Sequence, residues 1–122
     1  MPRDPASSAG RILIVEDEMM VSMMLQDMLE ELGYETLGPA TRLEEAVATA
    51  TVSDISAAVL DINLNGKETY PVAEVLRRRG IPFVFATGYG AEMVSERFPG
   101  TPALQKPFQR HELGRALAAV MR

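Results

Sequence analysis

Short apolar segments alternate along this chain with segments of helical periodicity, and that alternation limits the folds open to it. Apolar runs of strand length predict five strands, at 11–15, 34–39, 57–61, 82–86 and 103–105. Helical patterns follow them at about 19–32, 41–50, 71–79, 91–98 and 110–121. Strands that are apolar along their whole length are covered on both faces, and helical crossovers join parallel strands. The sequence therefore predicts an α/β fold with a five-stranded parallel sheet in one domain.

Local signals refine this outline. Thr41 and Glu44 form a capping-box pattern that opens the second helix. We interpret the three arginines at 77–79, which precede Gly80, as a helix C-terminus rather than a phosphate-binding patch. The segment 63–69, NLNGKET, is expected to be a loop.

The five methionines between 19 and 28 fall at helical spacing. They could form a partner surface, but we interpret them as core filler because methionine packs readily into irregular gaps.

The composition excludes several classes of protein. The chain has 122 residues and a net charge of −5, which argues against a nucleic-acid binder. It has no cysteine, so disulfides, thiolate metal sites and cysteine nucleophiles are excluded; this fits a reducing cytoplasm. No apolar run approaches the roughly 18 residues that a membrane span requires. Residues 1–9 are expected to form a disordered leader before a domain at 10–122.

Polar side chains follow four of the predicted strands, at the point where each strand ends. In an open parallel sheet these carboxyl ends meet at one edge, where ligands bind. Three of the side chains are carboxylates, which would repel one another unless a cation lay among them. Oxygen ligands without His or Cys favour a hard ion, so Mg²⁺ is the expected cofactor. The set is Glu16, Asp17, Asp61, Asn63, Thr87 and Lys106.

This set also has a chemical logic. A metal, an ammonium group and a hydroxyl around a carboxylate are what phosphoryl transfer needs, because charge on the phosphoryl oxygens must be neutralised. Each residue alone has a structural interpretation: a strand-end Asp can cap a helix, Thr87 can be a turn residue, and Lys106 can be a solvated charge. The order of all of them along the chain favours a functional site.

The motifs IVEDE and VLDIN, the Thr after the fourth strand and the Lys-Pro after the fifth resemble the receiver domain of two-component response regulators. The likeness covers residues 10–122. It implies a flavodoxin-like (βα)5 fold, a doubly wound parallel five-stranded sheet with strand order 2-1-3-4-5.

The resemblance also assigns roles. Asp61 would be the phosphoacceptor, taking a phosphoryl group from a histidine kinase or phosphotransfer protein. Asp17 would bind Mg²⁺ directly, Glu16 through water, and Asn63 through its backbone carbonyl. Thr87 and Lys106 would contact phosphoryl oxygens. Such a protein is not a classical enzyme, although it assists its own phosphorylation and dephosphorylation.

The stretch IPFVFATGYG at 81–90 is similar to the FATGUY subgroup of single-domain receivers, found in bacterial stress signalling. An aromatic switch residue that receivers carry before the strand-five lysine is Ala103 here, so Tyr89 is our switch candidate, with a mere covering role as the alternative. Asn65 replaces a usual proline. The intervals from Asp61 to Thr87 and from Thr87 to Lys106 are short for a receiver, which predicts a short fourth helix.

Three functions compete. The leading interpretation is a stand-alone cytoplasmic receiver that signals by phosphorylation-dependent binding to an unidentified downstream protein, or by phosphorelay. The second is a receiver-fold docking module that is not phosphorylated. The third, a nucleotide- or flavin-binding enzyme, is weakest: Gly88 and Gly90 lack a third spaced glycine, and Glu68 follows Gly66-Lys67 where a P-loop needs Ser or Thr.

Overall fold

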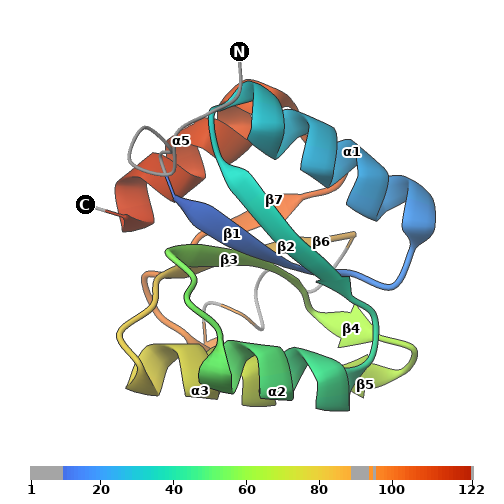
Figure 1. Cartoon of the computed structure of the whole chain (residues 1–122), viewed down its shortest axis with the longest axis vertical. Helices are drawn as coiled ribbons and strands as arrows, with labels where there is room; N and C mark the ends of the chain where they lie inside the picture. The colour runs from blue at the N-terminus through green and yellow to red at the C-terminus, as the bar shows by residue number, and fades with distance from the viewer. Residues whose placement is uncertain (1–9, 89–93, 95, 122) are drawn as a thin grey trace.

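A computed structural model describes residues 10–88, 94 and 96–121 and shows a single five-stranded sheet between two layers of helices (Figure 1). The sheet order is β2-β1-β3-β6-β7, and every neighbouring pair is parallel. Counting these five strands along the chain gives the expected order 2-1-3-4-5, so the predicted fold class is confirmed. The strands are β1 (Arg11–Val15), β2 (Glu35–Ala40), β3 (Ala57–Asp61), β6 (Phe83–Thr87) and β7 (Ala103–Gln105).

The helices divide between the two faces of the sheet. Helices α1 (Met19–Glu31) and α5 (Arg110–Val120) cover one face, and α2 (Leu43–Val52) and α3 (Tyr70–Arg78) cover the other (Figure 1). Successive side chains of a strand point to opposite faces. In β1, therefore, Ile12 packs with α1 and α5 whereas Leu13 packs with α2 and α3, and both are fully buried. No helix among the described residues has the length and apolar character needed to cross a bilayer.

Several expected boundaries shift by one residue: β2 and β6 lie one residue later than expected, and α3 lies one residue earlier. Helix α2 begins at Leu43, after Arg42, and no side chain caps it; instead the backbone N–H of Thr41 donates to Glu45 Oε1 at 2.9 Å. The predicted Thr41–Glu44 capping box is therefore wrong, because the second of two consecutive glutamates makes the contact. Strand β6 ends at Thr87 rather than before it.

Some expectations lie outside the described residues. These are the leader at 1–9, the switch candidate Tyr89 and half of the expected fourth helix at 91–98, in which Val94, Glu96 and Arg97 are described and helical.

The segment expected to be a loop, 63–69, contains an antiparallel hairpin of β4 (Asn63–Leu64) and β5 (Lys67–Glu68). Its two turn residues both have positive φ, 50° at Asn65 and 86° at Gly66. Asn-Gly is the pair that suits such a two-residue turn, because both residues tolerate this conformation. The loop prediction was wrong, and the Asn-Gly pair was the signal that could have corrected it.

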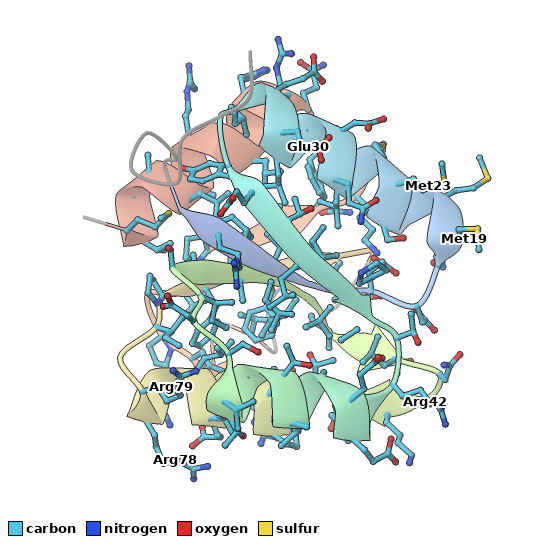
Figure 2. All side chains as sticks on the ribbon, viewed as in Figure 1. Met19, Met23, Glu30, Arg42, Arg78 and Arg79 are labelled. Carbon is cyan, nitrogen blue, oxygen red and sulfur yellow. The ribbon has the colours of Figure 1, made fainter. Side chains whose placement is uncertain are left out.

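The interpretation of the methionines as core filler was also wrong for most of them. Met19 and Met20 are 75% and 84% exposed, Met23 and Met24 are exposed as well, and Figure 2 shows Met19 and Met23 on the outer face of α1. Met28 alone of the five packs against the core. The buried stripe of α1 is Ser22, Leu25 and Leu29, so the other methionines lie on the opposite side of the helix.

The arginines at 77–79 behave as helix-terminal residues. Arg77 pairs with Glu74 at 2.7 Å and lies over the ring of Phe98. Arg79 Nη1 donates to the carbonyls of Ala50 and Ser53, at 2.7 and 2.9 Å, and so satisfies acceptors at the end of α2. Arg77 and Arg79 are therefore engaged in structural contacts that join α3 to its surroundings.

Within the described part of the chain, one buried side-chain hydroxyl has no hydrogen-bond partner. Tyr70, at the start of α3, is 3% exposed and packs its ring against Phe85 and Phe98, with centroid distances of 6.1 and 5.7 Å. Its hydroxyl is buried with no hydrogen-bond partner among the residues that the structure describes, whereas its ring is well packed. The free-energy cost of desolvating an unpaired hydroxyl is about 1–3 kcal/mol.

We predict that Tyr70→Phe raises the free energy of unfolding by about 1 kcal/mol, because it removes this desolvated hydroxyl and keeps the ring. Urea unfolding measures the change. Tyr34→Phe is the matched control: its ring is partly exposed, and we expect little effect there. A clear destabilisation by Tyr70→Phe would mean that the hydroxyl makes a stabilising contact in solution.

Candidate functional site

The carboxyl ends of β1, β3, β6 and β7 meet at one edge of the sheet and line a cleft of about 500 Å³. The register explains the convergence: Asp61 of β3 lies beside Ala86 of β6, and Thr87 lies beside Gln105 of β7. The backbone N–H of Lys106 donates to the carbonyl of Thr87 at 2.8 Å. All the residues predicted from strand ends reach this edge. Asp17, Asp61, Asn63, Thr87 and Lys106 line the cleft, and Glu16 lies buried below it.

Three carboxylates lie close together at this edge. Glu16, Asp17 and Asp61 each offer one oxygen, and these oxygens lie within 4.8 Å of one another. Glu16 is 1% exposed, whereas Asp17 and Asp61 are partly exposed to the cleft. Carboxylates this close repel one another unless positive charge compensates them.

Lys106 supplies part of that charge. Its Nζ lies 2.8 Å from Glu16 Oε1 and 3.6 Å from Asp61 Oδ2. Burial raises the pKa of Glu16 above its ordinary value, against the lowering effect of the Lys106 hydrogen bond, and Asp61 adds to the increase. Burial acts to lower the pKa of Lys106, but its bond to Glu16 and the charges of Asp61, Glu16 and Glu18 outweigh burial and raise it. The ammonium group is therefore firmly protonated.

The backbone around Asp61 is fixed by a residue that sequence reasoning missed. Thr69, which is fully buried, donates its hydroxyl to the carbonyl of Asp61 at 2.5 Å, and its N–H donates to the carbonyl of Ile62 at 2.8 Å. Both bonds hold the chain as it leaves β3. No local sequence signal distinguishes Thr69 from any threonine that precedes a helix.

Asn63 and Asn65 also have contacts that the sequence did not predict. Asn63 Oδ1 accepts from the N–H of Gly66 at 2.8 Å, so its side chain stabilises the hairpin turn and does not point freely into the cleft. The N–H of Asn65 donates to Asp17 Oδ2 at 3.0 Å. The role of the Asn63 carbonyl as a metal ligand stays a prediction.

Thr87 is 3% exposed at the end of β6, beside Lys106. The loop that follows it, including Tyr89, lies outside the described residues.

The donor set fits a magnesium ion. It consists of carboxylate oxygens at the cleft, with no soft or imidazole ligand among them. Mg²⁺ prefers one or two carboxylates together with waters and phosphate oxygens. Here the repulsion among three acids, only partly compensated by Lys106, is itself the electrostatic condition that favours a cation.

Comparisons with known proteins agree with this geometry. The family model described as response regulator receiver domain matches residues 12–118. The transcriptional regulatory protein PdtaR of Mycobacterium tuberculosis is 33% identical over 112 residues, covering 88% of this chain and 55% of that protein. The chain thus spans about half the length of this curated relative.

Two solved structures are similar over nearly their whole length. SdrG from Sphingomonas melonis Fr1 is 46% identical with a TM-score of 0.82, covering 92% of this chain and 96% of that one. The receiver domain of the sensor histidine kinase PA1611 from Pseudomonas aeruginosa PAO1 is 26% identical with a TM-score of 0.79, covering 93% and 98%. That structure has a magnesium ion coordinated in its active site cleft.

We predict that Lys106→Met lowers the free energy of unfolding by about 3 kcal/mol in metal-free buffer, because it leaves the buried Glu16 carboxylate without its cation. Adding Glu16→Gln to that variant should restore most of the loss, since the amide carries no charge. Urea unfolding of the wild type, both single variants and the double variant gives the coupling energy. Additive effects of the two substitutions would contradict a direct ion pair.

Proposed function

The chain belongs to the response regulator receiver domain family, and we propose that it accepts a phosphoryl group on Asp61 from a histidine kinase or phosphotransfer protein in a Mg²⁺-dependent reaction. The observation that carries the proposal is the setting of the Asp61 carboxylate. It opens on the cleft, is 13% exposed at its side chain, and lies 3.6 Å from the ammonium of Lys106 and close to two further carboxylates.

In the proposed reaction a carboxylate oxygen of Asp61 attacks the phosphorus of a phosphohistidine. The P–N bond breaks, a P–O bond forms, and the electron pair returns to the imidazole nitrogen of the donor. The product on this chain is an acyl phosphate. The protein contributes position and charge rather than covalent chemistry, as is general for phosphoryl transfer.

Glu16, Asp17, Asp61 and the carbonyl of Asn63 are the groups that would hold the metal. When bound, Mg²⁺ supplies positive charge to the phosphoryl oxygens and offsets the repulsion among the acids.

Lys106 and Thr87 would bind the oxygens of the phosphoryl group once it is on Asp61. Lys106 is bonded to Glu16 in this structure, and its ammonium can pair with a phosphoryl oxygen on Asp61 from nearly the same place, since Asp61 Oδ2 is 3.6 Å away. The hydroxyl of Thr87, at the neighbouring strand end, would donate to another oxygen. This change of partner links phosphorylation to the loop after β6, where Tyr89 is the proposed switch residue.

The signal would leave the chain through a protein partner. We propose a cytoplasmic receiver that binds a downstream protein when it is phosphorylated, or passes the phosphoryl group on, and that assists its own phosphorylation and dephosphorylation. A docking module without phosphorylation is the alternative, and the following experiment separates the two.

Incubation with Mg²⁺ and a small acyl phosphate should add the mass of a single phosphoryl group to the wild type, measured on the intact protein. Asp61→Asn should add none, because the amide is not a nucleophile. Chelation of the metal with EDTA should slow the wild-type reaction strongly. Asp54→Asn is the matched control, an exposed acid outside the cleft, and should react like the wild type.

If the wild type takes up nothing from the acyl phosphate or from a panel of phosphorylated histidine kinases, the phosphoacceptor proposal fails and the docking module stands.

A further inference from the structure

The β4–β5 hairpin projects from the end of β3 to the edge of the cleft and toward the first turn of α2 (Figure 1). It begins two residues after Asp61, and its turn consists of Asn65 and Gly66. Asn65 lines both the cleft and a separate hollow between the hairpin and α2. The hairpin is thus placed to connect the acidic site with the α2 face.

The tip of the hairpin makes a direct contact with the acidic cluster. The backbone N–H of Asn65 donates to Asp17 Oδ2 at 3.0 Å, across 48 positions of sequence. Within the part of the chain that the structure describes, this is the only hydrogen bond to the Asp17 carboxylate, because Lys106 reaches Glu16 and Asp61 instead. Asp17 therefore depends on the hairpin for a donor.

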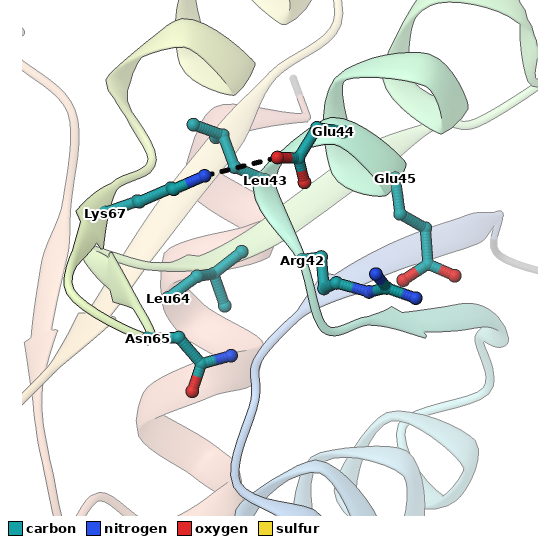
Figure 3. Close-up of a pocket in the computed structure, with 7 residues that line it drawn as sticks. All are labelled: Arg42, Leu43, Glu44, Glu45, Leu64, Asn65 and Lys67. Atoms are coloured by element: carbon teal, nitrogen blue, oxygen red, sulfur yellow. Dashed lines mark hydrogen bonds and ion pairs between the residues drawn. The ribbon is translucent and has the colours of Figure 1, made fainter.

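The base of the hairpin is anchored because Leu64 of β4 is buried in the core, but the tip has only weak polar contacts on the side of α2. Lys67 Nζ lies 3.2 Å from Glu44 Oε1, but the two side chains are 60% and 72% exposed, and exposed pairs contribute little. The side-chain amide of Asn65 reaches the carbonyl of Thr41 at 3.5 Å, a long contact. Between the hairpin and α2 lies a hollow of about 380 Å³, with Leu43 and Leu64 at its sides (Figure 3). The position of the tip is set mainly by the turn and by Asp17.

The turn places the donor only while residue 65 keeps its positive φ of 50°. Asparagine and glycine adopt this left-handed region readily, whereas a residue such as alanine does so at a cost of about 1–2 kcal/mol. The side chain of Asn63 supports the same geometry by accepting from Gly66. The identity of residue 65 therefore bears on where the N–H points.

The hydrogen bond from Asn65 affects where the Asp17 carboxylate lies. Glu16 and Asp61 repel Asp17, which is partly exposed and can turn toward water. A donated hydrogen bond opposes that turn and keeps the carboxylate in the cluster. The cost of assembling the three acids is then met before a cation arrives, which is how a pre-organised site gains affinity.

We propose that the β4–β5 hairpin is a positioning element for the metal site, in which the N–H of Asn65 holds the Asp17 carboxylate beside Glu16 and Asp61 and so sets the affinity for Mg²⁺. This rests on the proposed function, because it presumes that the acidic cluster binds Mg²⁺. Asn65 acts through its backbone conformation and through Asp17, not by touching the reacting atoms.

Two substitutions at residue 65 separate conformation from side chain. Asn65→Gly removes the side-chain amide but keeps the left-handed turn and the N–H. Asn65→Ala removes the same amide and strains the turn. We expect Asn65→Gly to bind Mg²⁺ as the wild type does and Asn65→Ala to bind about fivefold more weakly. Lys67→Ala is the matched control, because it breaks the hairpin contact to α2 and leaves Asn65 in place.

The affinity is measured by titrating Mg²⁺ into uniformly ¹⁵N-labelled protein and following backbone amide shifts, with no phosphoryl donor present. The amide proton of residue 65 in the metal-free protein is the second readout: it should lie downfield in the wild type and Asn65→Gly, and move upfield in Asn65→Ala. Urea unfolding shows whether Asn65→Ala and Lys67→Ala lower overall stability to a similar degree. If residue 65 had a purely structural role, two variants of similar stability would also bind Mg²⁺ with similar affinity.

The outcomes are distinct. Weaker binding by Asn65→Ala, with Asn65→Gly and Lys67→Ala unchanged, supports the positioning role. Equal affinities for Mg²⁺ in all four proteins overturn it and leave the proposed function intact. Tighter binding by Asn65→Ala also overturns it, because that result would show that the hydrogen bond competes with the metal. A wild type that does not bind Mg²⁺ overturns the proposed metal site, and the positioning role with it.

Discussion

The convergence of three carboxylates at the end of a parallel sheet is the constraint on which the rest of this site depends. A parallel arrangement sends the carboxyl ends of all strands to one edge, so Glu16, Asp17 and Asp61 meet there whatever their separation in sequence. Their repulsion must be offset for the fold to be stable. Lys106, arriving from the far side of the sheet after β7, offsets it for Glu16 and Asp61, and the hairpin N–H does so for Asp17.

This compensation is incomplete, and the incompleteness suits the proposed function. Two of the acids face the cleft, and a single ammonium cannot neutralise three charges. A cation or a phosphoryl group that enters therefore finds partners already in place. Lys106 needs little movement to change from Glu16 to a phosphoryl oxygen on Asp61. Crowding like charges lowers the stability of the fold, and binding of a cation would offset that loss, which is a general feature of pre-organised sites.

The site could be predicted from the sequence largely because it lies at strand ends. Asp61 ends a strongly apolar strand and Lys106 follows a short one, and one geometric rule then brings them together. Contacts made by local backbone geometry were not predictable in the same way. The bond from Asn65 to Asp17 requires a turn whose strands are only two residues long, and the hydroxyl of Thr69 finds Asp61 only once α3 is placed.

The prediction that the methionines of α1 fill the core was wrong for another reason. Helical spacing shows that residues share a face but not which face is buried, and here Leu25 and Leu29 decide it, leaving Met19 and Met23 exposed.

The measurement that tests the central claim most directly is chemical mapping of the phosphorylated residue. Borohydride reduces an acyl phosphate on aspartate to homoserine, and peptide mass spectrometry then locates that residue. After reaction with a phosphoryl donor and Mg²⁺, the account predicts homoserine at position 61 and at no other acid, with much less formed when the metal is chelated. Homoserine at Asp17, 2-amino-5-hydroxyvaleric acid (the alcohol that a glutamyl phosphate yields) at Glu16, or a phosphoryl group that resists borohydride would contradict it.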